Sequence, residues 1–206
     1  MRKYWSKAVV HIDHFSRDVA GLVQPGQMSA YPVDLVEQRR LDDGTLLRLR
    51  PIRADDLAMH ARFAQTLSAA THYARFLSSR KLGDAELKRM TDIDYASELA
   101  LVATVDVAGM EDEIGVARYV ATSMSTPGAS AGVAVVVTDR WQRRGVAEQL
   151  MRKLIAAAAD RGVARFEDIT LHDNRAMLTL ARKLGFTARR DLLDPYLVGL
   201  SLRLSH

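Results

Sequence analysis

The residues best placed for chemistry lie where an apolar, strand-like run meets a long amphipathic segment. Residues 133–137 are all apolar, and after a short polar stretch the chain reads Gln142, Arg143, Arg144, Gly145, Val146 and Ala147. A helix pattern begins at Val146, and the first turn of a helix binds anions because its N–H groups are unpaired. Gly145 allows close approach of the backbone, and the two arginines add positive charge. We interpret residues 142–147 as a phosphate-binding loop; a plain basic helix entry is the alternative.

The composition excludes several other kinds of site. The 206 residues include no cysteine, so disulfides, thiolate metal sites and cysteine nucleophiles are excluded. His11 and His14 are two isolated candidate ligands, and we expect no metal site. No apolar run approaches the ~20 residues of a membrane span, and the N-terminus lacks the apolar core of a secretory signal. We therefore expect a cytoplasmic protein that does not enter a membrane.

The charge pattern favours a small anionic ligand over nucleic acid. The net charge is +4, but Lys and Arg are spread along the chain and mixed with acids, and aromatic residues make up 6%. A nucleic-acid-binding protein concentrates basic residues on one face with aromatic residues among them. We expect a polyanionic small molecule as the partner, and no nucleic acid.

Hydrophobic periodicity and turn residues predict the order of the structural elements. We expect strands at 33–40 and 45–50 around a turn at 42–44, followed by helices at 57–67, 70–78 and 84–91. Strands at 99–105, 114–121 and 132–137 follow, with a polar connection at 109–113. A helix at 146–160, a strand at 166–171, a helix at 174–184 and strands at 186–190 and 196–204 complete the chain. This order predicts an α/β (α+β) fold with a mixed sheet and helices on both faces.

Residues 1–30 show no clear periodicity and end in a turn signal at 24–27. We expect them to form an N-terminal arm or linker, and residues 31–206 to form a single domain.

Three segments carry a family resemblance. Gln142-x-x-Gly145-x-Ala147 resembles the acyl-CoA pyrophosphate loop of the GNAT superfamily of N-acetyltransferases. The pattern Asn174-x-x-Met177-x-x-Leu180, with residues 183–186 after it, resembles the second signature of that family, and residues 48–57 resemble its opening strand and helix. Residues 76–81, 92–95 and 99–103 are similar to the acetyltransferase domain of bacterial protein lysine acetyltransferases.

The resemblance implies a mostly antiparallel sheet that splays into a V, with acetyl-CoA as cosubstrate in the gap. The splayed strands would be 132–137 and 166–171. Backbone N–H groups in the segment Val135, Val136 and Val137 would pair with the pantetheine arm, and the N–H of Val135 would polarise the thioester carbonyl. The amides of residues 143–147 would hold the pyrophosphate. Asn174 would bond the cofactor arm, cap the following helix, or do both.

Two positions depart from the family pattern. Ala181 stands where many members have the tyrosine that protonates the leaving thiolate, and Gly132 stands where protein-modifying members have a glutamate base. Loss of general acid–base catalysis lowers the reaction rate ~10²–10⁴-fold. Glu98, Tyr119 and His172 are weak substitutes, since each also fits a structural or solvent-exposed role.

Two functions therefore stay open. The first is an acyl-CoA-dependent N-acyltransferase that moves acetyl to a primary amine, on a protein lysine or a small molecule, by direct attack. The second is a non-catalytic acyl-CoA-binding or regulatory module. The last strand and the N-terminal arm are the natural places for a homodimer contact.

Overall fold

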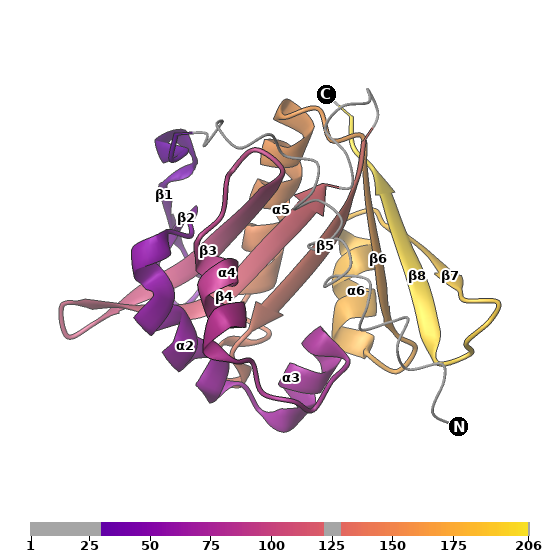
Figure 1. The fold of residues 1–206 in the computed structure, drawn as a ribbon, viewed down its shortest axis with the longest axis horizontal. Helices are drawn as coiled ribbons and strands as arrows, with labels where there is room; N and C mark the ends of the chain where they lie inside the picture. Colours follow the sequence, from indigo (N-terminus) through magenta and orange to yellow (C-terminus); the bar gives the residue numbers. More distant parts are fainter. Residues whose placement is uncertain (1–29, 122–128, 206) are drawn as a thin grey trace.

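The protein is built around a mixed eight-stranded sheet with helices on both faces (Figure 1). The computed structural model describes residues 30–121 and 129–205. The strands are β1 (Glu37–Arg40), β2 (Leu46–Pro51), β3 (Glu98–Val107), β4 (Met110–Ala121), β5 (Ser130–Val137), β6 (Arg165–Leu171), β7 (Thr187–Arg190) and β8 (Leu197–Arg203). The helices are α2 (Leu57–Thr66), α3 (Ala69–Phe76), α4 (Asp84–Thr91), α5 (Val146–Asp160) and α6 (Arg175–Lys183), with 3-10 turns η1 (Val33–Leu35), η2 (Ala54–Asp56) and η3 (Asp139–Trp141).

The sheet is antiparallel except at its centre, where it splays. Its order is β1-β2-β3-β4-β5-β6-β8-β7, and β5 and β6 form the parallel pair. These two strands stay in register over three residues each, the last pair being Gly132 and Glu167. Beyond that pair, β5 is paired on one side with β4 and β6 on the other side with β8. The expected V-shaped sheet is thereby confirmed.

Helix α5 packs its apolar stripe on the sheet and forms the main core with it. Val146, Leu150 and Leu154 recur on one helix face and are at most 1% exposed. Their neighbours in the core come from β3, β4 and β5. Figure 1 shows α5 and α6 on one face of the sheet and α2, α3 and α4 on the other. Gly162, with a φ of 80°, follows the C-cap residue Arg161 at the end of α5, where the sequence predicts a stop.

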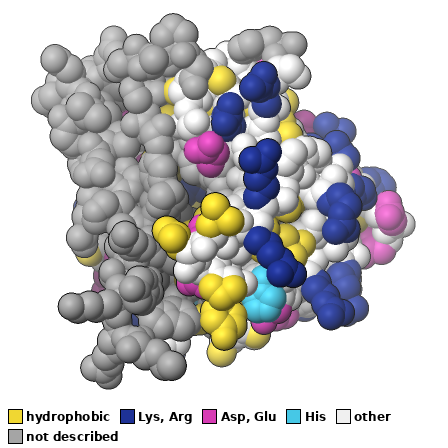
Figure 2. Space-filling model, turned by 90° about the vertical axis from the view of Figure 1, so that its right-hand side faces the viewer, with side chains coloured by type: hydrophobic (Ala, Val, Ile, Leu, Met, Phe, Trp, Pro, Cys, Tyr) yellow, Lys and Arg dark blue, Asp and Glu magenta, His cyan; other side chains and the backbone are white. Residues whose placement is uncertain are grey.

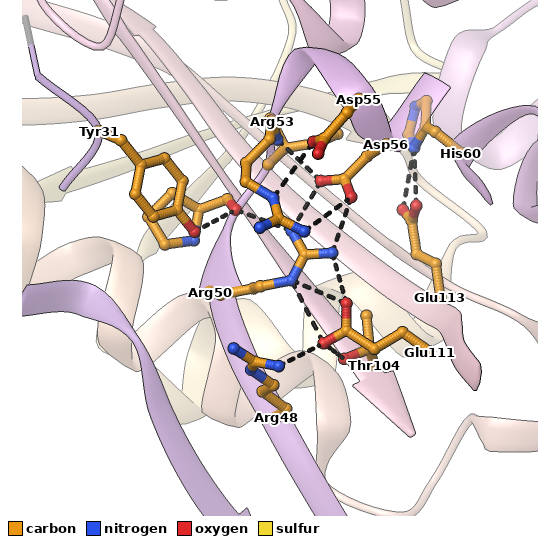
Figure 3. Close-up of polar contacts among 12 residues, drawn as sticks. Tyr31, Arg48, Arg50, Arg53, Asp55, Asp56, His60, Thr104, Glu111 and Glu113 are labelled. Carbon is orange, nitrogen blue, oxygen red and sulfur yellow. Dashed lines mark hydrogen bonds and ion pairs between the residues drawn. The ribbon is translucent and has the colours of Figure 1, made fainter. Parts of the chain in front are cut away.

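A buried ion network joins the other face of the sheet to the start of α2 (Figure 3). The Arg50 side chain on β2 is 1% exposed and bonds both carboxylate oxygens of Asp56, at 2.7 and 2.8 Å. It also bonds Glu111 on β4 at 2.7 Å. Burial alone would raise the pKa of Asp56, but hydrogen bonds from Arg50 and from the Arg53 N–H outweigh it, so the pKa is lowered. A buried charge is tolerated when it is paired and bonded in this way.

Most bounds differ by one or two residues from those expected, and two strands begin at clearly different positions. Residues 33–35 form η1 rather than the start of a strand, because Pro32 opens a turn in which Leu35 bonds back to its carbonyl. Residues 110–113 belong to β4 and not to a polar connection, because Ala108 and Gly109, both with positive φ, make the turn alone. The acidic residues that read as a loop are strand residues with partners: Glu111 binds Arg50, and Glu113 binds His60 at 2.9 Å.

Two kinds of feature are absent from the described residues. None of their helices is long and apolar enough to cross a bilayer. No group of three or more His, Asp or Glu side chains among them is arranged to hold a metal ion. The predicted arm at residues 1–30, with His11 and His14, lies outside the described residues except for its last position.

Candidate active site

A cavity of about 920 Å³ fills the gap between β5 and β6. Its walls come from β5, β6, the loop after η3, and the helices α3, α4, α5 and α6. A volume of this size matches the ligand pockets of proteins, which run from ~300 to ~1,000 Å³. The gap in the sheet is therefore an accessible site rather than a packed core.

The open edge of β5 offers backbone groups to this cavity. Thr138 donates its N–H to Ile114 on β4. Since amides alternate in direction along a strand, the N–H groups of Val137 and Val135 point the opposite way, into the gap. Val135, Val136 and Val137 all line the cavity. Two donors spaced in this way can pair with the amides of an extended ligand.

The loop that leads into α5 presents a row of free donors. Among the described residues, the backbone N–H groups from Arg143 to Glu148 have no hydrogen-bond partner. Arg143, Gly145, Val146, Ala147 and Glu148 line the cavity. Unpaired amides at the positive end of a helix fit a diphosphate.

Gly145 gives the loop its shape. Its φ is 82°, and a Cβ built there would meet nothing within 4 Å. Arg143 is also in the left-handed region, with a φ of 61°. Two such residues in one short loop indicate a conformation kept for binding rather than for packing. The open space over Gly145 is where a phosphate would lie.

The polar side chains of the loop serve mainly to hold it. Gln142 donates to the carbonyl of Val137 at 3.1 Å and to the hydroxyl of Thr71 on α3 at 3.2 Å. Arg144 turns away from the cavity, pairs with Asp43 at 2.9 Å and lies over the ring of Trp141. Gln142 lines the cavity and Arg144 is not among its lining residues, and both stay predicted contributors to cofactor binding.

Asn174 caps α6. Its side-chain oxygen accepts from the Met177 N–H at 3.1 Å, and its amide nitrogen donates to the Thr170 hydroxyl at 3.1 Å. Asn174 also lines the cavity. The cap predicted from the sequence is confirmed, whereas a bond to the cofactor arm stays a prediction.

The three weak catalytic candidates are not among the described residues that line the cavity. Glu98 pairs with the buried Arg118 at 3.1 Å, which itself also bonds the Met90 carbonyl. Tyr119 is fully buried in the core against Phe166. His172 is exposed, contacts the ring of Tyr196 and lies 3.3 Å from its carbonyl. Each has a structural explanation, and a catalytic role for any of them stays a prediction.

Sequence reasoning missed the carboxylates that line the cavity, one of which is Asp168 on β6. Burial raises the pKa of Asp168 to about 7, and the Ile169 N–H and the Arg75 charge oppose this only in part. A carboxyl group with such a pKa in a cavity is a candidate for proton transfer. The pair Glu167–Asp168 inside an expected strand was the available signal, but a strand pattern does not reveal which of two neighbouring acids is buried.

The fold also brings positively charged side chains together on one face, which their spacing in the sequence does not show. Figure 2 shows Lys and Arg side chains crowded on the side of the molecule that carries β7 and β8. Arg175, Arg182, Arg189 and Arg190 are exposed, although acids separate many of the cations in the sequence. Arg175 and Lys183 also line the cavity. A positive face beside the cavity steers polyanions toward it.

A splayed sheet, outward-facing amides on one strand and a row of free amides at a helix start define a class of protein that binds a long ligand carrying a diphosphate. Comparisons with known proteins identify the family. The family model described as "Acetyltransferase (GNAT) domain" matches residues 47–187. The chain belongs to the GNAT acetyltransferase family.

Two curated relatives and one solved structure give the same result. An acetyltransferase of Pseudomonas aeruginosa is 36% identical over 152 residues, which is 73% of this chain and 80% of the relative. Acetyltransferase Pat of Mycolicibacterium smegmatis is 35% identical over 72% of this chain, but that match spans 44% of the relative. The GNAT domain of S. lividans PAT superposes with a TM-score of 0.77 at 30% identity, covering 85% of this chain and 100% of that domain.

Proposed function

We propose that the protein transfers the acetyl group of acetyl-CoA to a primary amine by direct attack. The observation that carries this proposal is the cavity between β5 and β6, with free amides along the loop that leads into α5. The N–H groups of Arg143, Gly145 and Ala147 would hold the diphosphate, and those of Val135 and Val137 would hold the pantetheine. Positioning of the thioester in this way supplies much of the rate of such a reaction.

The N–H of Val135 would polarise the thioester carbonyl. A donor placed to stabilise the developing negative charge on that oxygen contributes roughly 3 kcal/mol to lowering the barrier. Since the amine attacks the carbonyl directly, the reaction needs no cysteine or serine nucleophile and no metal.

The acceptor in this proposal is a lysine side chain of a protein. Phe76, Leu77, Leu82 and Met90 give the α3–α4 side of the cavity an apolar wall. Such a wall suits the four-methylene stem of lysine, whose ammonium end can meet the carboxylates deeper in the cavity. The resemblance of residues 76–81, 92–95 and 99–103 to bacterial protein lysine acetyltransferases supports this choice of acceptor, alongside the matches to Acetyltransferase Pat and to the GNAT domain of S. lividans PAT.

Thiol release from acetyl-CoA tests the proposal against a panel of amines. We expect release with lysine-containing peptides, and less with small amines such as polyamines. A thermal shift in parallel reports binding, because a ligand at 100 times its Kd stabilises by about 2.7 kcal/mol. A shift with no release above the uncatalysed rate favours the non-catalytic acyl-CoA-binding module, for which the evidence is Gly132 and Ala181 at the usual base and acid positions.

Three further expectations belong with this proposal. Residues 31–206 would form the acetyltransferase domain and residues 1–30 an arm. The protein would act in the cytoplasm, without nucleic acid or membrane as partner. A homodimer would form through the arm or through the last strand.

A further inference from the structure

Asp168 lies at the point where β5 and β6 separate. It directly follows Glu167, the last β6 residue in register with β5, and it lines the cavity. On its other side, β6 pairs with β8, where its partner Leu200 is 2% exposed. The residue therefore lies on a strand that is paired on its far side, at the narrow end of the gap.

The carboxylate of Asp168 forms few hydrogen bonds within the described part of the chain. Among the described residues, its hydrogen-bond donor is the N–H of Ile169, at 2.8 Å from Oδ1. The other four carboxylates that line the cavity each have a basic or hydroxyl partner: Glu86 with Arg80, Asp139 with Ser68 and Thr71, Glu148 with Lys183, and Glu167 with Arg165. Asp168 differs from them in having no ion pair within 4 Å among the described residues.

The surroundings of Asp168 set its proton affinity near neutrality. Burial raises its pKa to about 7, while the Ile169 N–H and the Arg75 charge lower it in part. The pKa values of Glu86, Asp139 and Glu148 are lowered. Charged groups line the cavity from each element around it: Arg75 of α3, Arg80 of the loop before α4, Glu86 and Arg89 of α4, Asp139 of η3, Arg143 of the loop after it, Glu148 of α5, Glu167 of β6, and Arg175 and Lys183 of α6. Gly132 and Ala134 of β5 and Leu200 of β8 carry no charge.

The strand opposite lacks the carboxylate that protein-modifying members of the family place there. That position is Gly132, which is in register with Glu167, one residue before Asp168. We propose that Asp168 is the general base of this enzyme and takes the proton that the acceptor amine must lose before it attacks. This inference rests on the proposed acetyl transfer.

The proton balance of the step is complete without another reactant. The Asp168 carboxylate accepts one proton from the ammonium group, directly or through one water, and leaves a neutral amine. The nitrogen lone pair forms a C–N bond with the thioester carbonyl, and the C–S bond then breaks. The second nitrogen proton passes to the thiolate, which leaves as the thiol, and Asp168 returns its proton to solvent. One proton is released for each amide formed.

The variant Asp168→Asn tests this assignment by its pH–rate profile. We expect kcat/KM to fall about 10²–10³-fold, and the rise of activity around pH 7 to disappear. Acetyl-CoA affinity should change less than about threefold, because a group that acts only in proton transfer does not hold the cosubstrate. Asp168→Glu should restore part of the rate. Asp160→Asn, at the exposed end of α5, is the matched control and should leave both the rate and the profile unchanged.

Three results would overturn the assignment. The first is an Asp168→Asn protein that keeps more than a third of the wild-type rate. The second is a Glu167→Gln protein that loses the neutral limb of the pH–rate profile while Asp168→Asn keeps it. The third comes from urea unfolding between pH 5 and pH 8, which needs no activity: we expect wild type to lose stability relative to Asp168→Asn as the pH rises through 7. Equal pH dependence of the two proteins means that Asp168 does not titrate there. If wild type binds acetyl-CoA but acetylates no amine, the proposed transfer itself fails, and the urea series still decides the state of Asp168.

Discussion

Gly132 on β5 and Glu167 on β6 are the last residues of these two strands that stay in register. Every later residue of β5 keeps its neighbour on β4 and has none on β6. The cavity, the free edge of β5 and the carboxylate of Asp168 all follow from the separation of the strands at this pair.

Gly145→Ala should weaken CoA binding by about tenfold or more, ~1.4 kcal/mol. Its Cβ would enter the open space over the loop where we place the diphosphate, and alanine at a φ of 82° carries strain of ~1–2 kcal/mol. Calorimetric titration with acetyl-CoA measures the affinity, and urea unfolding measures the strain.

Gly162→Ala is the matched control for this variant. Gly162 follows the other end of α5, has a φ of 80°, and also has nothing within 4 Å of a Cβ. Its variant should lose similar stability and bind acetyl-CoA as wild type does. Equal affinity losses in both variants would show that strain, and not the ligand space, explains the effect.

Val135→Pro should retain the fold and lose turnover by ~10²–10³-fold. The N–H that proline removes points into the gap and belongs to no β-ladder, a setting in which proline is tolerated in a strand. Val136→Pro, one residue on, removes an N–H directed at β4 and should unfold the protein or strongly destabilise it. Circular dichroism and thiol release separate the two; a Val135→Pro enzyme with normal kcat would remove Val135 as the oxyanion donor.

Arg50→Ala should destabilise the protein by ~3–5 kcal/mol, because Asp56 would be left as a buried, uncompensated charge. Arg48→Ala removes a cation from the same Glu111, but the Arg48 side chain is 47% exposed, and its loss should cost no more than ~1 kcal/mol. Urea unfolding at pH 7 compares the two. A similar loss of unfolding free energy in the two variants would mean that the burial of Arg50 adds nothing to the stability of the network.

Stability should fall as the pH drops below about 4, the ordinary range of an unfolded aspartate. The pKa of Asp56 is lowered in the folded protein because the bonds from Arg50 and Arg53 outweigh the effect of burial. Its stabilising contribution is therefore fully present above the unfolded pKa and is lost as the pH falls through the folded one. Urea midpoints between pH 7 and pH 3 should fall less steeply for Asp56→Asn than for wild type; parallel slopes would contradict the network's role.

The sequence predicted those parts of the site that depend on local pattern. The loop at 142–147, the start of α5 at Val146 and the cap at Asn174 follow from turn and cap residues, and the structure places each as expected. The V-shaped opening of the sheet is predicted only by the family resemblance, because hydrophobic periodicity does not show where two strands separate. Asp168 was missed because its proton affinity depends on burial between β5 and β8, which a strand pattern does not reveal. Glu111 and Glu113 read as loop because their partners, Arg50 and His60, are more than fifty residues away.

The most direct test of the account is calorimetric titration of the wild-type protein with acetyl-CoA, in parallel with Gly145→Ala. The account predicts one saturable site per chain in wild type and a marked loss of affinity in the variant. Absence of heat with acetyl-CoA and with every other coenzyme A derivative, or equal affinity of the two proteins, would contradict it.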